Sequence, residues 1–212
     1  MPRVSQQHKH RQRTEILQAA RRCFVRNGFH RTSMHDVCTE AGRSPGTVYQ
    51  YFSSKDEMIL AVATQNLADV TEALHTAVRS GGAQTEPGQV MATLLDEVTA
   101  RHTNDQLATV ALMVWSEALR NPELADRLRQ AGATMTRDLA ELVRERQTAG
   151  AAPALPAEAV AKVILAVLPG YLLNLALLDP GAPDDFPGIL RALWPNHTSP
   201  GDQTSPVVRP GN

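Results

Sequence analysis

The sequence predicts an all-α protein of about nine helices, with a small N-terminal domain followed by a larger helical domain. Apolar residues recur at helical spacing along most of the 212 residues, and no segment shows the polar and apolar alternation that is typical of strands. Helix start and stop signals divide the chain, and residues 33–52 hold two short helical segments in close succession. A helix-turn-helix is therefore expected near the N-terminus.

The first of these short segments is a helix whose two ends are both marked. Ser33 can cap its N-terminus, and Asp36 places a carboxylate near the free backbone N–H groups and the positive end of the helix dipole. Gly42 supplies the left-handed conformation that ends the helix. Ser44 then caps a second helix with Pro45 at its first position, where a missing N–H costs nothing.

A helix-turn-helix of this kind is typical of DNA-binding proteins. The second helix lies in the major groove and its first residues reach the base edges, while the first helix crosses the backbone. The sequence therefore predicts DNA contacts from the turn and from the start of the second helix. These residues are Arg43, Ser44, Pro45, Gly46, Thr47 and Gln50.

Charge is distributed unevenly along the chain. Residues 1–56 contain ten Lys and Arg against four Asp and Glu, a net charge of +6, whereas the remainder carries −7. Local positive charge binds phosphate and makes DNA affinity fall with salt, although a charge run alone is as typical of a solvated helix face. Beside the helix-turn-helix, the nucleic-acid interpretation is favoured. Residues 1–9 are expected to form a flexible basic arm.

The N-terminal part of the chain also carries a series of residues at fixed spacing, namely Ala20, Phe24, Gly28, Thr32-Ser33, Ala41-Gly42, Gly46-Thr47-Val48-Tyr49, Tyr51-Phe52 and Ser54-Lys55. This series resembles the N-terminal domain of the TetR (tetracycline repressor) family of transcriptional regulators. The resemblance implies a DNA-binding domain at 10–56, a helical regulatory and dimerisation domain at 57–195, a homodimer and usually a small-molecule inducer. Arg43 and Pro45 depart from the residues that are common in the family.

The resemblance further implies contacts to the DNA backbone. Thr32 and Ser33 open the helix that crosses the backbone, and Tyr49 and Tyr51 project hydroxyls from the recognition helix. Lys55 begins the next helix, where an ammonium and free N–H groups can share one phosphate. The alternative for the two tyrosines is a place in the core.

The composition gives no sign of an oxidising compartment or of a membrane. Cys23 and Cys38 lie on apolar helical stripes and are expected to be core thiols rather than a disulfide or a metal pair. The N-terminus lacks the apolar segment of a signal peptide, and the strongest apolar run, 163–178, is shorter than the ~20 residues that span a bilayer. A cytoplasmic protein without metal, cofactor or membrane partner is predicted.

Beyond the DNA-binding domain, every long segment is predicted to be helical. Ser54 and Glu57 form a capping box for a helix at 55–79 that links the two domains. Glycine and proline predict a linker at 150–156 and a loose tail at 196–212. The remaining helices are expected at 87–102, 107–120, 122–148, 157–178 and 185–194.

The segment 157–178 is apolar on almost all sides, and such a helix must be buried on all sides. One face can serve the core of its own domain, so the other needs a partner. A second copy, packed through the last two helices of each chain as the family implies, would place two recognition helices on a pseudo-palindromic operator. The expected dimer contacts are Val160, Val163, Ile164, Val167, Leu168, Leu172, Leu175, Leu190 and Trp194.

A ligand pocket is expected near the middle of this apolar segment. Pro169 removes a helical hydrogen bond and Gly170 permits a kink, which predicts space for a small apolar or amphipathic effector. The alternative for each candidate is an ordinary core position or, for Glu117, a salt bridge with Arg120 or Arg144. The candidate lining residues are Met91, Leu95, His102, Met113, Trp115, Glu117, Met135, Tyr171 and Asn174.

Two other functions are compatible with the sequence. The first is a DNA-binding dimer without an inducer, controlled by abundance or by a partner protein. The second is an enzyme, for which Asp96, Glu97 and His102 are the candidate groups. Adjacent carboxylates diverge by about 100° on a helix, and no phosphate loop, nucleophile elbow or paired cysteine ligands occur, so the enzyme is disfavoured.

Overall fold

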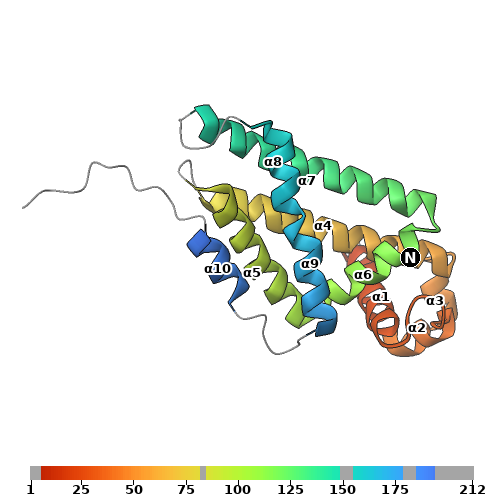
Figure 1. The fold of residues 1–212 in the computed structure, drawn as a ribbon. Helices are drawn as coiled ribbons and strands as arrows, with labels where there is room; N and C mark the ends of the chain where they lie inside the picture. Colours follow the sequence, from red (N-terminus) through yellow and green to blue (C-terminus); the bar gives the residue numbers. More distant parts are fainter. Residues whose placement is uncertain (1–5, 82–84, 149–154, 179–184, 194–212) are drawn as a thin grey trace, which may run out of the picture.

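Helices form every regular element in the described part of the chain (Figure 1). The computed structural model describes residues 6–81, 85–148, 155–178 and 185–193. Ten α-helices and one π-helical turn follow one another in these residues. Three consecutive segments near the C-terminal end make up one bent helix, so these described residues hold nine helical elements, which confirms the all-α prediction.

The N-terminal head, defined as residues 6–54, has the predicted caps. Ser33 accepts a hydrogen bond from the backbone N–H of Asp36, whose carboxylate accepts one from the N–H of Ser33, and Gly42 ends the helix at φ 61°. Ser44 accepts a hydrogen bond from the N–H of Thr47, with proline at the first position of the second helix. Both short helices are therefore fixed by local contacts. The three helices of the head are α1 (Gln6–Asn27), α2 (Met34–Ala41) and α3 (Pro45–Tyr49).

Helix α1 begins earlier than predicted. Residues 6–9 were expected to belong to a flexible arm, but they are helical. Thr14 donates a hydrogen bond to the carbonyl of His10, and Arg11 lies 3.7 Å from Glu15 at the i,i+4 spacing that supports a helix. The rest of the predicted arm, residues 1–5, lies outside the described residues.

Helix α4 (Lys55–Gly81) leads from the head into the body, defined as residues 85–193. The hydroxyl of Ser54 accepts from the N–H of Glu57, as predicted, but the Glu57 carboxylate accepts from Ser53 instead of completing the box with Ser54. Figure 1 shows α7 running beside α4, with α8 packed on α7 and α10 on α5. The body contains α5 (Pro87–Asp105), α6 (Leu107–Ala118), α7 (Pro122–Thr148), α8 (Ala157–Leu165), α9 (Val167–Leu173), η1 (Asn174–Leu178) and α10 (Phe186–Leu193).

The core of the head does not stop at the predicted boundary of residue 56. Phe24 and Phe52 are fully buried in it, and so are Met58 on α4 and Val110 on α6. The same cluster continues through α4 to Ala63 and includes Val114 and Leu124 of the body. Head and body are thus packed together by apolar side chains, so that a movement of α4 or α6 acts directly on the head.

The predicted helix at 157–178 is bent. Helix α8 ends at Leu165, Ala166 forms a turn, and the last five residues are π-helical. Pro169 explains the break because it cannot donate to the carbonyl of Leu165. The segment Ala157–Leu177, which begins before the predicted apolar run 163–178, has the length and mean hydropathy, 1.9, of a membrane-spanning helix, with 28% of the window buried.

Candidate nucleic-acid interface and ligand cavity

The start of α3 and the turn before it form an exposed surface of the head. Tyr49 is 51% exposed, and Pro45, Gly46 and Gln50 are exposed beside it. The hydroxyl of Thr47 lies 2.9 Å from that of Ser44 within the cap, and since a hydroxyl can make three hydrogen bonds, both can accept a further partner. Short side chains at this position let the backbone approach a base edge closely.

The predicted backbone contacts differ in their surroundings. Lys55 and Ser33 are at the surface, although the ammonium of Lys55 donates to the carbonyl of His30. Tyr51 donates its hydroxyl to Gln12 of α1 at 2.7 Å, which ties α3 to α1. Thr32 is only 1% exposed and donates inside the head, so its side chain does not offer the phosphate contact that was expected from its position before α2.

Several cations of the head are paired with acids of the head. The Glu40 carboxylate accepts hydrogen bonds from Arg22 at 2.7 Å and Arg26 at 2.8 Å, and these contacts hold its pKa below the ordinary value. Arg43 pairs in the same way with Glu15 at 2.9 Å. Phosphate would replace a carboxylate as the partner of these guanidinium groups.

Arg31 is a further cation of this surface that sequence analysis counted only toward the net charge. It is exposed one residue before Thr32, and within the described residues it has no hydrogen bond or ion pair. Its place beside the start of α2 suits a contact to the DNA backbone. The sequence contains a signal for this role, since Arg31 directly precedes the Thr32-Ser33 start of the first short helix.

Arg21, counted as a basic charge of the head, instead joins the head to the body. Its guanidinium donates to Asn66 Oδ1 at 2.8 Å and to the carbonyl of Asp105 at 2.6 Å, and it lies 3.9 Å from Asp69. Burial lowers the pKa of Arg21, and its two acidic neighbours oppose that shift. A second link is the 3.3 Å contact of His30 Nε2 with the carboxylate of Glu117.

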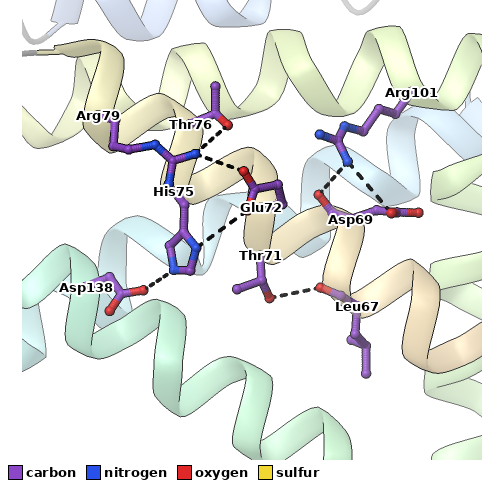
Figure 2. A network of polar contacts seen from close by, with 9 residues as sticks. All are labelled: Leu67, Asp69, Thr71, Glu72, His75, Thr76, Arg79, Arg101 and Asp138. Atoms are coloured by element: carbon purple, nitrogen blue, oxygen red, sulfur yellow. Dashed lines mark hydrogen bonds and ion pairs between the residues drawn. The ribbon is translucent and has the colours of Figure 1, made fainter.

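Polar contacts also fix α4 against two helices of the body (Figure 2). Asp69 lies 3.8 Å from Arg101 of α5, and Arg101 also donates to the carbonyl of Asp69. One turn and a half later, His75 makes a 2.7 Å contact with Asp138 of α7. Asp69 therefore stands between Arg21 of the head and Arg101 of the body, so that α4 connects the two regions through charges as well as through apolar packing.

A cavity of about 340 Å³ lies between α4, α6, α7 and the bent helix. This volume is within the usual range of ligand sites, and its walls are mainly aliphatic with Trp115 and Met135 added. Pro169 and Ala166 at the break of the bent helix also contribute to the lining, as the predicted kink implied. The polar side chains of the lining other than Trp115 are Asn66, Thr136 and Lys162.

Of the predicted ligand residues, Trp115 and Met135 line this cavity and the others do not. Met91 and Leu95 are buried in the core of the body, and Met113 packs against the core of the head. These three are core positions, the alternative that the sequence left open. Asn66 was not predicted as a lining residue because its position on α4 carries no local signal for a pocket.

The predicted polar ligand groups have partners elsewhere. His102 accepts from the N–H of Ala108 through Nδ1, and burial lowers its pKa. Glu117 pairs with His30, not with Arg120 or Arg144. The remaining two are Tyr171, whose hydroxyl lies 2.6 Å from that of Thr99 and whose pKa is raised by burial, and Asn174, which donates to the carbonyl of Gly170.

The predicted dimer residues fall on different faces. Val163 is 73% exposed, whereas Leu168, Leu172, Leu175 and Leu190 are buried in the core of their own chain. The turn at Ala166 changes the direction of Leu168 and Leu172, and the π-turn that of Leu175, whereas Leu190 lies on the separate helix α10. Val160, Ile164 and Val167 are partly buried against that core, and Trp194 lies outside the described residues. The exposed aliphatic residues of these helices are Val163, Leu173, Leu177, Ile189 and Leu193.

No group of His, Cys, Asp or Glu that could hold a metal ion occurs in residues 6–81, 85–148, 155–178 and 185–193. An exposed helix-turn-helix, packed onto a helical body with an apolar cavity, defines a DNA-binding regulator. Two family models match the chain: "Bacterial regulatory proteins, tetR family" over residues 16–62, and "BetI-type transcriptional repressor, C-terminal" over residues 87–193. The chain belongs to the TetR family of transcriptional regulators, which are not enzymes.

Relatives and solved structures are similar over nearly the whole chain. The regulator UidR of Escherichia coli (strain K12) is 29% identical over 85% of this chain and 90% of its own length, and the uncharacterized regulator YfiR of Bacillus subtilis (strain 168) is 32% identical over 84% and 86%. Salmonella enterica GusR superposes with a TM-score of 0.67 and 25% identity over 91% and 96% of the two chains. Bacillus subtilis FadR in complex with stearoyl-CoA has the same fold, with a TM-score of 0.68 and 16% identity over 85% and 94%.

Proposed function

We propose that the protein is a cytoplasmic, homodimeric repressor that binds a pseudo-palindromic operator and releases it when a small molecule occupies the cavity. The observation that carries this proposal is the shared packing of head and cavity. Val114 of α6 and Leu128 of α7 line the cavity and also belong to, or pack on, the core of the head. A ligand that separates these helices therefore acts on both regions.

Operator binding is assigned to α3 and to the cations around it. Thr47 and Gln50 face the bases, and Tyr49, Arg31 and Lys55 hold the backbone. The arginines that pair with Glu40 and Glu15 exchange these carboxylates for phosphates on binding.

The dimer is assigned to the exposed aliphatic residues of the bent helix and α10. These two elements meet where the rings of Tyr171 and Phe186 lie 5.5 Å apart, and both carry large exposed side chains, including Leu177 at 66% and Leu193 at 65%. Exposed apolar surface of this kind marks an interface. A second copy of the chain covers it in this proposal, in place of a lipid bilayer.

Effector binding is coupled to the head through Asn66. This residue lines the cavity, is 1% exposed and accepts a hydrogen bond from Arg21 of α1. An effector that moves Asn66 changes the position of α1 relative to α4. The spacing of the two heads then no longer matches successive major grooves, and the operator-bound state loses affinity.

Selection of genomic fragments on the full-length protein, followed by fluorescence anisotropy of the selected duplex, tests DNA binding. Gln50→Ala should change sequence preference, and Arg31→Ala should weaken binding to all duplexes and reduce the salt slope by about one. Arg137→Ala is the matched control because Arg137 is an exposed, unpaired arginine of the body among the described residues. Equal affinities for Arg31→Ala and Arg137→Ala would contradict the interface.

The oligomeric state and the effector are tested separately. Analytical ultracentrifugation should show a dimer, and Leu177→Glu with Leu193→Glu should produce monomers. A metabolite library screened by thermal shift should include a compound that stabilises the protein in a saturable manner and also releases the operator. A dimer that binds DNA but responds to no compound would instead support a regulator controlled by abundance or by a partner.

A further inference from the structure

The cavity lining contains one charged side chain, and its ammonium has no partner. Lys162 of α8 is that residue, and no acid is among the other lining residues. Within the described part of the chain, no ion pair or hydrogen bond of Lys162 is found. Glu158, one turn earlier on the same helix, is paired with Arg144 of α7 at 3.4 Å.

Two of the other polar lining groups already have partners in the protein. Asn66 accepts from Arg21, and the hydroxyl of Thr136 donates to the carbonyl of Gly132 at 2.8 Å. A ligand with many hydroxyl groups would leave most of them unpaired against aliphatic walls, which is costly. Because the walls are aliphatic and Lys162 is exposed beside them, the cavity is complementary to a molecule with one apolar part and one anionic end.

We propose that the effector is an amphipathic anion whose carboxylate, or an anion of similar size, pairs with Lys162 while its apolar chain fills the cavity. This inference rests on the proposed function, since it names the ligand class of the same cavity. A volume of about 340 Å³ is at the small end of the usual range of ligand sites, which suits a short apolar chain.

Three ten-carbon probes that differ in the head group test the ligand class on the full-length protein. Decanoate, decanol and decyltrimethylammonium are titrated below their micelle concentrations and followed by calorimetry. Decanoate should bind about tenfold more tightly than decanol, because a charge-assisted contact is added, and the cation should bind most weakly. Lys162→Met keeps the apolar stem and should remove the tenfold preference, whereas Lys162→Arg should retain it.

Gly132 supplies the control that places the probes in the cavity. A Cβ at this lining residue meets no atom within 4 Å, so Gly132→Leu has room to project into the cavity and favours the helix. It should abolish the binding of decanoate and decanol alike. Binding that survives Gly132→Leu, or a Lys162→Met variant that still prefers decanoate, would overturn the proposal.

The two proposals fail differently. If decanol or the cation binds as tightly as decanoate, or if none of the probes binds, the anionic class is wrong. Another compound that releases the operator and is excluded by Gly132→Leu would still support a cavity-bound effector. Failure of every compound in the library to release the operator would overturn the effector itself.

Discussion

The contacts that stabilise the head and those that stabilise the body differ greatly in how far apart their residues lie in the sequence. In the head, the contacts that define α2 and α3 join residues three positions apart, such as Ser33 with Asp36. In the body, Arg146 pairs with Glu86 across 60 positions, and Tyr171 meets Thr99 across 72. The recognition helix is therefore shaped by its own neighbours, whereas the cavity exists only when distant helices have assembled.

The largest expected effect is the loss of the buried ion pair of the body. Arg146 is 3% exposed and Glu86 is 8% exposed, so Arg146→Ala removes a guanidinium partner from a buried carboxylate. The free energy of unfolding should fall by about 3–5 kcal/mol in urea denaturation. The double variant Arg146→Leu with Glu86→Leu should recover much of this loss. A loss below about 1 kcal/mol in Arg146→Ala would show that the pair is solvated.

The next effect concerns the joint between the two regions. Arg21→Met removes the hydrogen bonds to Asn66 and Asp105 but keeps an apolar side chain of similar length. If these contacts carry the coupling, the ratio of operator affinities without and with effector should fall by about tenfold, within the usual coupling range of 1–3 kcal/mol. Arg101→Met, on the other side of Asp69, is the matched control for a general weakening of α4. An unchanged ratio in Arg21→Met would remove this contact from the mechanism.

A smaller loss of stability is expected at the cap of α2. Ser33→Ala should lower the free energy of unfolding by about 1 kcal/mol, because the N–H of Asp36 loses its acceptor. Hydrogen bonds from Ser33 hold the pKa of Asp36 below the ordinary value, so the ionised carboxylate stabilises the folded head above about pH 4. This contribution is lost as the pH falls through the folded-state pKa. Asp36→Asn should therefore flatten the acid limb of stability, and an unaltered limb would contradict the assignment.

The features of the head that depend on local contacts were predictable from the sequence, and those that depend on distant contacts were not. The caps at Ser33, Gly42 and Ser44 were predicted correctly because each signal acts within one helical turn. Thr32 was misplaced, and the role of Arg21 at the joint with the body was not predicted, because the face that meets the rest of the protein depends on packing. Spacing along one helix says nothing about the helices that will surround it.

In the body, helix bounds were predictable, but the direction of side chains after a bend was not. The limits of α7 agree with the prediction, because proline marks its start and apolar spacing continues to its end. Leu172 and Leu173 are neighbours in sequence, yet the first is 1% exposed and the second 41%. Adjacent residues of a helix point about 100° apart, and the turn at Ala166 sets which of the two faces the core. The sequence did not single out Lys162, since a single lysine on an apolar helix usually marks the solvent face.

The smallest expected effect concerns the carboxylate of Glu40 in the head, whose charge can be removed without a change in side-chain size. Glu40→Gln removes the carboxylate that engages Arg22 and Arg26 but keeps a side chain of the same size. The fold should be retained because both arginines are exposed, while operator affinity should rise modestly and the salt slope should steepen by at most about one phosphate equivalent. Glu141→Gln, an exposed acid of α7, controls for net charge. If both variants steepen the slope equally, net charge is the cause; if only Glu40→Gln does so, the paired arginines contact phosphate.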